Sequence, residues 1–284
     1  MSSKSVKGVS LKMIEMYITV FACRLASILF YEGYLPFDSS GDYLYRGMEI
    51  AGFFMCLTIA LCTITMFKDT YESSADSFGK TIYKYRVYVL AFNNVYVFIF
   101  IPSLTNPLSI FLSSFNSGHI LGVPSFMGII WVVAPSFVLA LIFHPSLNSN
   151  MLTDVSWTFA LALESTAILP QIIMYIKSLK DAQKKGIEAG NEGWVSHILA
   201  CLGLARLIHL VFWLSSYTEL NDKFNSSPGG SHVGHFVVFS QCVQLLLMCD
   251  YLYYYVKALY SGGNISSELQ NNWASSGKSA DEFA

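Results

Sequence analysis

The chain has 284 residues, of which 54% are hydrophobic and only 13% are charged. A soluble domain carries about 25% charged residues, so a soluble fold of this composition would expose more apolar surface than water tolerates. The net charge of −2 argues against a nucleic-acid partner. The composition therefore predicts an all-α protein whose surface faces the lipid bilayer.

The six cysteines lie inside apolar runs, which is typical of buried thiols that act as small hydrophobic side chains. The sequence has no CxxC pair or Cys/His cluster that would indicate a disulfide framework or a metal site. It also lacks GxSxG, HExxH and P-loop patterns. We therefore expect no enzyme activity, no metal and no cofactor.

Apolar runs recur along the whole chain. A bilayer core about 30 Å thick is crossed by roughly 20 helical residues. The run 87–102 is short for a crossing, whereas six others are of spanning length: 12–30, 48–67, 124–143, 157–176, 197–217 and 233–260. The pattern predicts a polytopic bundle of six transmembrane helices.

Basic loops indicate the orientation, because lysine and arginine are enriched on the cytosolic side of membranes. Segments 68–86 and 177–193 are both rich in these residues, so both are expected in the cytosol. The helix at 157–176 must then begin on the lumenal side, so the chain crosses the membrane an odd number of times between Arg86 and His144. One crossing is favoured over three, which makes 87–123 an insertion. We expect residues 1–260 to form the membrane domain and 261–284 a polar, disordered cytosolic tail.

Several ionisable residues lie inside the apolar runs, where they are costly unless they face a cavity or one another. Arg206, His209 and Trp213 share one helical face. Asp154, Trp157, Glu164 and Gln171 recur at spacings that predict a second shared face. The full set of inward polar candidates is Arg24, Glu49, Asp154, Glu164, Gln171, Arg206, His209 and Asp250.

These charges have two interpretations. They form structural pairs, or they bind a ligand that has both a carboxylate, which arginine grips with its planar fork, and an ammonium group. His209 is likewise either a pH sensor, since its unperturbed pKa is about 6.5, or a neutral histidine bonded to a carbonyl.

Four stretches carry a resemblance to a known family. The most specific is Leu163-Glu-Ser-Thr-Ala-Ile-Leu-Pro-Gln171. The others are Gly8–Lys12 with Val20–Arg24, Thr70–Glu72 with Asp76–Phe78, and Leu202–Arg206 followed by Trp213, Val243-Gln244 and Cys249–Tyr251. Together they resemble the ER lumen protein-retaining (KDEL) receptor family over residues 8–260, apart from the segment 87–123.

The resemblance implies a fold of seven helices, built as two three-helix bundles and a linker helix. This architecture is similar to that of PQ-loop (SWEET-like) sugar transporters, with Pro170-Gln171 as the PQ step. The implied function is binding of the C-terminal Lys/His-Asp-Glu-Leu tetrapeptide of escaped ER lumenal proteins in the acidic Golgi. Coatomer-coated vesicles then return the receptor to the ER membrane, where the higher pH releases the cargo.

The resemblance also implies residue roles. Arg24 falls on an arginine that holds the ligand's terminal carboxylate, and Arg206 on an arginine of the same pocket. Asp154 falls on an acid that faces the basic residue of the signal. Trp157 and Trp213 fall on pocket tryptophans.

Two further acids have roles by resemblance. Glu164 falls on an acid of the polar network, and Asp250 on a last-helix acid needed for retrograde transport. The family's first helix has no counterpart, His209 and Ala205 replace pocket tyrosines, and the tail lacks a lysine pair for coatomer. These departures leave two alternatives to the receptor open: a PQ-loop-type small-solute transporter and a paralogue with a degenerate pocket.

Overall fold

The computed structural model describes residues 5–31, 42–76, 78, 129–145, 150–186, 193–217 and 233–273. Every regular element in these ranges is helical, which confirms the predicted all-α class. The main helices are α1 (Leu11–Ile28), α2 (Asp42–Thr65), α5 (Ile130–Phe143), α6 (Met151–Glu164), α7 (Leu169–Lys184), α8 (Gly193–Ser215) and α10 (Val233–Ser261). Three short elements are η1 (Lys68–Thr70), α11 (Ile265–Glu268) and the π-helical turn η5 (Leu269–Trp273).

Four helical segments in the described part of the chain are long and apolar enough to cross a bilayer: Asp42–Thr65, Met151–Lys184, Trp194–Ser215 and Val233–Ser261. The apolar helix Val132–Phe143 is shorter. Large hydrophobic side chains point outward from these segments, such as Met55, which is 64% exposed, and Ile208, which is 62% exposed. Lipid accommodates such a surface, so the chain is a multi-pass membrane protein. The predicted insertion at 87–123 lies outside the described residues.

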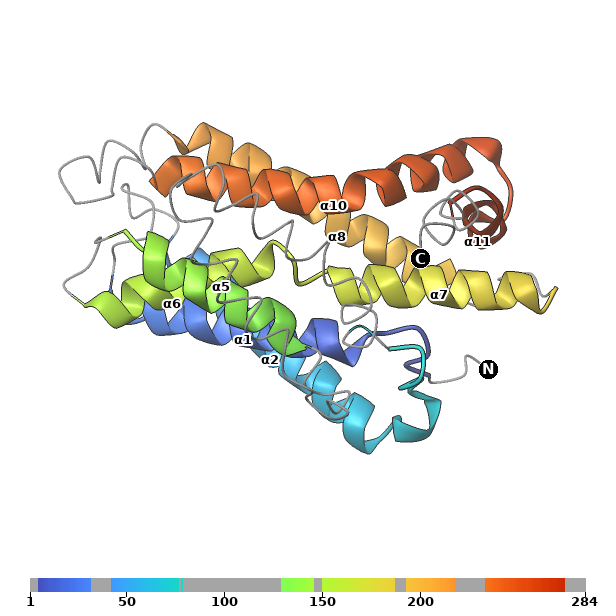
Figure 1. Cartoon of the computed structure of the whole chain (residues 1–284), viewed down its shortest axis with the longest axis horizontal. Helices are drawn as coiled ribbons and strands as arrows, with labels where there is room; N and C mark the ends of the chain where they lie inside the picture. Colours follow the sequence, from blue (N-terminus) through green and yellow to red (C-terminus); the bar gives the residue numbers. More distant parts are fainter. Residues whose placement is uncertain are drawn as a thin grey trace, which may run out of the picture.

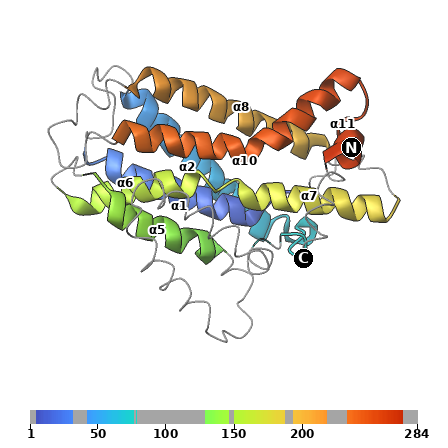
Figure 2. The same ribbon diagram turned by 45° about the horizontal axis from the view of Figure 1, so that its top comes forward.

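The helices pack in two groups that α6 and α7 connect (Figure 1). In one group α1 lies against α2 and α6, and α6 also packs on α5. In the other group α8 packs along α10. Buried apolar clusters fill the space between elements, with Val20, Phe159 and Leu163 in the first group and Tyr175, Leu199 and Met248 around the second. The turned view in Figure 2 shows the same long helices running along one axis.

The predicted span at 157–176 is a broken helix. α6 ends at Glu164, residues 165–168 form turns, and α7 begins at Leu169 with Pro170 in its first turn. Proline lacks a backbone N–H and has a fixed φ, so it suits a helix start and interrupts a continuous helix. After the break, Gln171 contacts Gly8 and Ser10, directly before α1, while Glu164 contacts Arg24 of α1.

All lysines of the described residues lie toward the end of the bundle where α1 begins and where α2, α7 and α10 end (Figure 1). They are Lys7, Lys12, Lys68, Lys177, Lys180, Lys184, Lys185 and Lys257. We call this end the lysine-rich end. Cytosolic loops are enriched in basic residues, so the arrangement agrees with the orientation that the loops predict.

Part of the polar tail is folded, which corrects the expectation of disorder over 261–284. Gly262 has φ +68°, a left-handed conformation that glycine adopts at little cost, and it reverses the chain after α10. The side chain of Asn264 accepts a hydrogen bond from the Ser266 N–H at 3.1 Å and caps α11. Leu269 is fully buried against α7, α8 and α10, because its apolar side chain completes the cluster there. Residues 274–284 lie outside the described part.

Replacing Leu269 with alanine should detach this segment. Truncation of a buried leucine costs about 2–5 kcal/mol, so we expect residues 265–273 to lose their protection while the long helices stay folded. Hydrogen–deuterium exchange of the segment measures this change. The matched variant Leu259→Ala, at a leucine that is 51% exposed, should leave the exchange unaltered. Continued protection in Leu269→Ala would contradict the packed tail.

Candidate functional site

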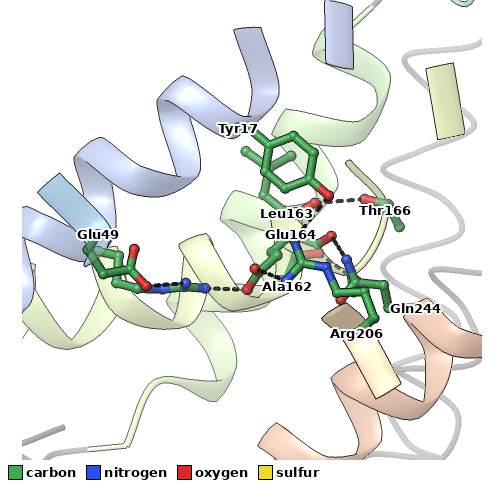
Figure 3. A network of polar contacts seen from close by, with 10 residues as sticks. Tyr17, Glu49, Ala162, Leu163, Glu164, Thr166, Arg206 and Gln244 are labelled. Atoms are coloured by element: carbon green, nitrogen blue, oxygen red, sulfur yellow. Dashed lines mark hydrogen bonds and ion pairs between the residues drawn. The ribbon is translucent and has the colours of Figure 1, made fainter. Parts of the chain in front are cut away.

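Four charged side chains from four helices meet inside the bundle (Figure 3). Arg24 of α1 donates from Nη1 to Glu49 Oε1 of α2 at 2.9 Å, and from Nη2 to Glu164 Oε2 at the end of α6. Arg206 of α8 donates from Nη1 to Glu164 Oε1 at 2.5 Å and from Nη2 to the Tyr17 hydroxyl at 3.2 Å. The carboxylate of Glu164 therefore bridges two arginines.

The network is almost fully removed from solvent. The side chains of Arg24, Glu49 and Glu164 are 5%, 8% and 4% exposed, and that of Arg206 is 14% exposed. Two arginines and two glutamates balance to no net charge. Removing ions from water is costly, and only close pairing with additional hydrogen bonds offsets that cost. Each of the four helices contributes one of these charges, and separating any helix from the others would leave a buried charge unpaired at a high cost in free energy.

The break between α6 and α7 also brings the backbone of Glu164 into the site. A carbonyl in the last turn of a helix lacks its i+4 partner. The carbonyl of Glu164 accepts hydrogen bonds from the Ala167 N–H of the turn at 3.3 Å and from Gln244 Nε2 of α10 at 3.0 Å. Figure 3 shows Glu164 between Glu49 on one side and Arg206 and Gln244 on the other. The helix end therefore joins α10 to the same centre.

Buried polar atoms without a hydrogen-bond partner continue from this network along α8 and α10. Buried polar groups are normally bonded, so unbonded ones indicate places where a ligand or water binds. On α8 they are Arg206 Nε, His209 Nδ1 and Trp213 Nε1, and on α10 they are Ser240 Oγ, Gln241 Oε1 and Gln244 Oε1. We call this set the polar row.

The polar row extends toward the end opposite the lysine-rich end, because α8 ends and α10 begins there. From Arg206 to Trp213 it covers about 10 Å along the axis of α8. An extended chain advances about 3.3 Å per residue, so the polar row is as long as about three peptide residues. It offers the N–H donors of Arg206 and Trp213 and the carbonyl acceptors of Gln241 and Gln244.

The structure gathers some of the predicted site residues and separates others. Arg24, Glu164 and Arg206 converge in the network, and His209 lies in the polar row. Trp213 belongs to the polar row through Nε1, while its ring packs in one apolar cluster with Trp157 and Leu161.

Asp154 and Asp250 lie apart from the network. Asp154 is 1% exposed and precedes Glu164 on the same helix by ten residues, which is about 15 Å along the axis. Asp250 lies on the exposed side of α10. The acid predicted to bind a ligand and the acid predicted to serve transport therefore occupy different surroundings.

Tyr17 and Gln241 were missing from the residues predicted for the site. Tyr17 precedes Arg24 by seven residues, a spacing that places both on one face of α1, so the sequence contained a signal for it. Gln241 and Gln244 are glutamines in an otherwise apolar run, and polar residues inside a span generally face the bundle interior.

A second polar cluster fixes the lysine-rich end. Gln171 Nε2 at the start of α7 donates to the Gly8 carbonyl at 2.7 Å, and its Oε1 accepts from the Ser10 N–H at 2.8 Å. Asp76 accepts from Ser10 Oγ at 3.0 Å and from the Tyr71 hydroxyl at 2.7 Å. Burial raises the pKa of Tyr71, and the neighbouring Asp76 carboxylate raises it further, so the phenol stays a proton donor.

Comparison with known proteins assigns this arrangement to a family. The sequence model described as ER lumen protein retaining receptor matches residues 5–121 and 124–216, well over half of the chain. The chain belongs to the ER lumen protein-retaining receptor family. This confirms the resemblance, and because the members are receptors, it also confirms that the chain is not an enzyme.

Individual receptors of the family are similar over part of their length. The ER lumen protein-retaining receptor of Entamoeba histolytica is 30% identical over 132 residues, 46% of this chain and 51% of that receptor. That of Drosophila melanogaster is 25% identical over 178 residues, 63% of this chain and 73% of that receptor. Receptor 3 of Mus musculus is 34% identical over 113 residues, 40% of this chain and 44% of that receptor. The chain thus spans about half the length of two of these three receptors.

The matched ranges include every residue predicted to bind a ligand in this receptor-family chain, from Arg24 to Trp213, whereas Asp250 and Gln244 lie beyond them. The first range also runs through most of segment 87–123. The description of that segment as an insertion stays a prediction.

Replacing Glu164 with glutamine tests the network. The change leaves two buried arginines with one carboxylate, and breaking such a buried pair costs about 3–5 kcal/mol. We expect a clear fall in the unfolding temperature of the detergent-solubilised protein, followed by tryptophan fluorescence. Glu72→Gln removes a surface pair with Lys7, whose atoms are 3.4 Å apart, and such pairs contribute about 0–1 kcal/mol. Equal shifts in the two variants would contradict a buried network.

Proposed function

We propose that this protein is a receptor for the C-terminal tetrapeptide of ER lumenal proteins, of the Lys/His-Asp-Glu-Leu type, and that it returns escaped proteins from the Golgi membrane to the ER membrane. The observation that carries the proposal is the polar row beside the two arginines. It combines the free Nε–H of the Arg206 guanidinium with other unsatisfied donors and acceptors, which suits the end of a peptide chain better than an apolar ligand.

A ligand carboxylate can bind without breaking the network. Both Nη atoms of Arg206 donate within the protein, but its Nε is buried and unbonded. An N–H of a guanidinium beside a carboxylate forms a charge-assisted hydrogen bond, which is stronger than a neutral one. The terminal carboxylate of the ligand therefore has a donor at the inner end of the polar row.

The separation of the charges supports a ligand of about four residues. Asp154 and Glu164 are about 15 Å apart along α6, and an extended tetrapeptide is about 13–14 Å long. A peptide whose carboxylate lies at the level of Arg24 and Arg206 brings its first residue near the level of Asp154. A basic first residue, Lys or His, then meets an acid.

The broken helix favours a second candidate function, a PQ-loop-type small-solute transporter. Discontinuous transmembrane helices near the middle of the membrane are typical of transporters. The break at residues 165–168 and the polar cluster of Gln171 and Asp76 beyond it fit that class. The charged centre favours a peptide, since a sugar needs neutral hydrogen-bonding partners. A paralogue with this fold and no ligand is the third alternative.

Peptide binding to Trp213→Phe tests the receptor. The change removes the Nε1–H, which has no partner in the free protein, and keeps an aromatic ring. Because phenyl is smaller than indole and Trp213 is buried, some loss of stability is expected, so the titration is run well below the unfolding temperature of the variant. One hydrogen bond contributes about 0.5–1.5 kcal/mol, so affinity for a His-Asp-Glu-Leu peptide should fall about 2- to 10-fold. Calorimetric titration of the purified protein measures this loss, and Trp194→Phe, at an exposed tryptophan, is the control.

The same titration separates the alternatives. A receptor binds the His-Asp-Glu-Leu peptide better than a scrambled peptide, and better at pH about 6 than at about 7.4 if His209 Nδ1 takes up a proton beside the ligand. A transporter takes up solute into vesicles and binds neither peptide. A chain with no peptide binding and no uptake is the paralogue without a ligand.

Asp250→Asn tests a role in transport. Because Asp250 lies apart from the network and the polar row, we expect unchanged peptide affinity. We also expect the variant to accumulate in the Golgi, measured by microscopy of the tagged full chain with Golgi and ER markers. Normal cycling of Asp250→Asn would remove this residue from the transport step.

A further inference from the structure

An apolar groove runs along the outside of α8 and α10, away from the network. Its volume is about 690 Å³, in the range of small-molecule sites. Its lining includes Leu207 of α8 and, on α10, Leu245, Leu252, Val256, Lys257 and Tyr260. The groove is thus a shaped, mostly apolar surface with a single charge.

α8 and α10 pack closely beside the groove. A Cβ atom on Gly203 would lie 2.8 Å from Leu252 Cδ2, a side chain that also lines the groove, so the glycine leaves room for Leu252 in its present position. Beyond this contact the C-terminal end of α10 rises away from α8 (Figure 1). The last three turns of α10 line the groove with Leu252, Tyr253, Val256, Lys257 and Tyr260.

Lys257 supplies the charge at one end of this space. It is exposed and has no ion-pair partner among the described residues. It lies about one turn before the end of α10, at the lysine-rich end. Tyr260, three residues after Lys257 on α10, is 89% exposed. Tyrosines are enriched at the depth of lipid headgroups. The position of Lys257 therefore corresponds to the headgroup layer.

We propose that this groove binds an anionic phospholipid of the cytosol-facing leaflet. The acyl chain lies along Leu207, Leu252 and Val256, and the headgroup phosphate pairs with Lys257. That leaflet carries a negative surface potential, and each lysine near it contributes about 1 kcal/mol of attraction. The charge of Lys257 and its depth in the membrane both favour an anionic phospholipid. Free phosphate would leave the apolar lining of the groove without a partner.

A second copy of the chain or a partner helix fits the groove less well. Either would have to supply a carboxylate at the level of Lys257, because an uncompensated charge in an interface is destabilising. A phospholipid supplies the compensating charge and the apolar chain in one molecule. The proposal does not depend on whether the polar row binds a peptide.

The test measures lipid selectivity of the purified full chain. The protein is delipidated, then exchanged into micelles with equal amounts of phosphatidylserine and phosphatidylcholine that have identical acyl chains, and bound lipid is counted by native mass spectrometry. We expect about fivefold enrichment of phosphatidylserine. Lys257→Gln should reduce the ratio to about one, whereas Lys257→Arg should retain it, because the cation is what binds the phosphate.

Two further variants separate the groove from a general charge effect. Lys184→Gln removes an exposed lysine of α7 at the same end of the bundle and should keep the wild-type ratio. Cys249→Trp fills the groove, which Cys249 lines, and should reduce retention of both lipids. Equal loss of selectivity in Lys184→Gln and Lys257→Gln, unchanged retention in Cys249→Trp, or no selectivity in the wild type would each overturn the proposal.

Discussion

The bridge that Glu164 forms between Arg24 and Arg206 holds the bundle together at its centre. Lipid chains are as apolar as leucine side chains, so the hydrophobic effect does not drive one membrane helix against another. Directional polar contacts take over that role. Here a balanced set of two arginines and two glutamates fixes the relative positions of α1, α2, α6 and α8, because a shift of any one helix would leave a buried charge unpaired.

The broken helix makes this bridge possible. With α6 ending at Glu164, the side chain of that residue reaches the arginines while its carbonyl reaches Gln244. The Glu164 carbonyl also accepts a hydrogen bond from the Ala167 N–H at 3.3 Å within the turn. After the turn, Gln171 binds the chain before α1. One break therefore supplies both polar clusters.

The two ends of the bundle carry different sets of buried polar groups. At the lysine-rich end, Gln171 and Asp76 bind the N-terminal segment, and the folded tail covers α7 through Leu269. Toward the other end, buried donors and acceptors on α8 and α10 have no partners. Under the proposed function, the peptide supplies the bonds that the polar row lacks.

Sequence alone determined the all-α membrane class, the family and the ionisable residues that lie within the membrane-spanning runs. The scarcity of charge required lipid contact, and the few ionisable residues within apolar runs had to face the interior. It could not determine which charges pair, because periodicity is a local property and Arg24 meets Glu164 across 140 positions. Nor could it show that Asp154 lies away from the network, or that Leu269 anchors a polar tail. Those outcomes depend on how helices pack, which only the tertiary structure decides.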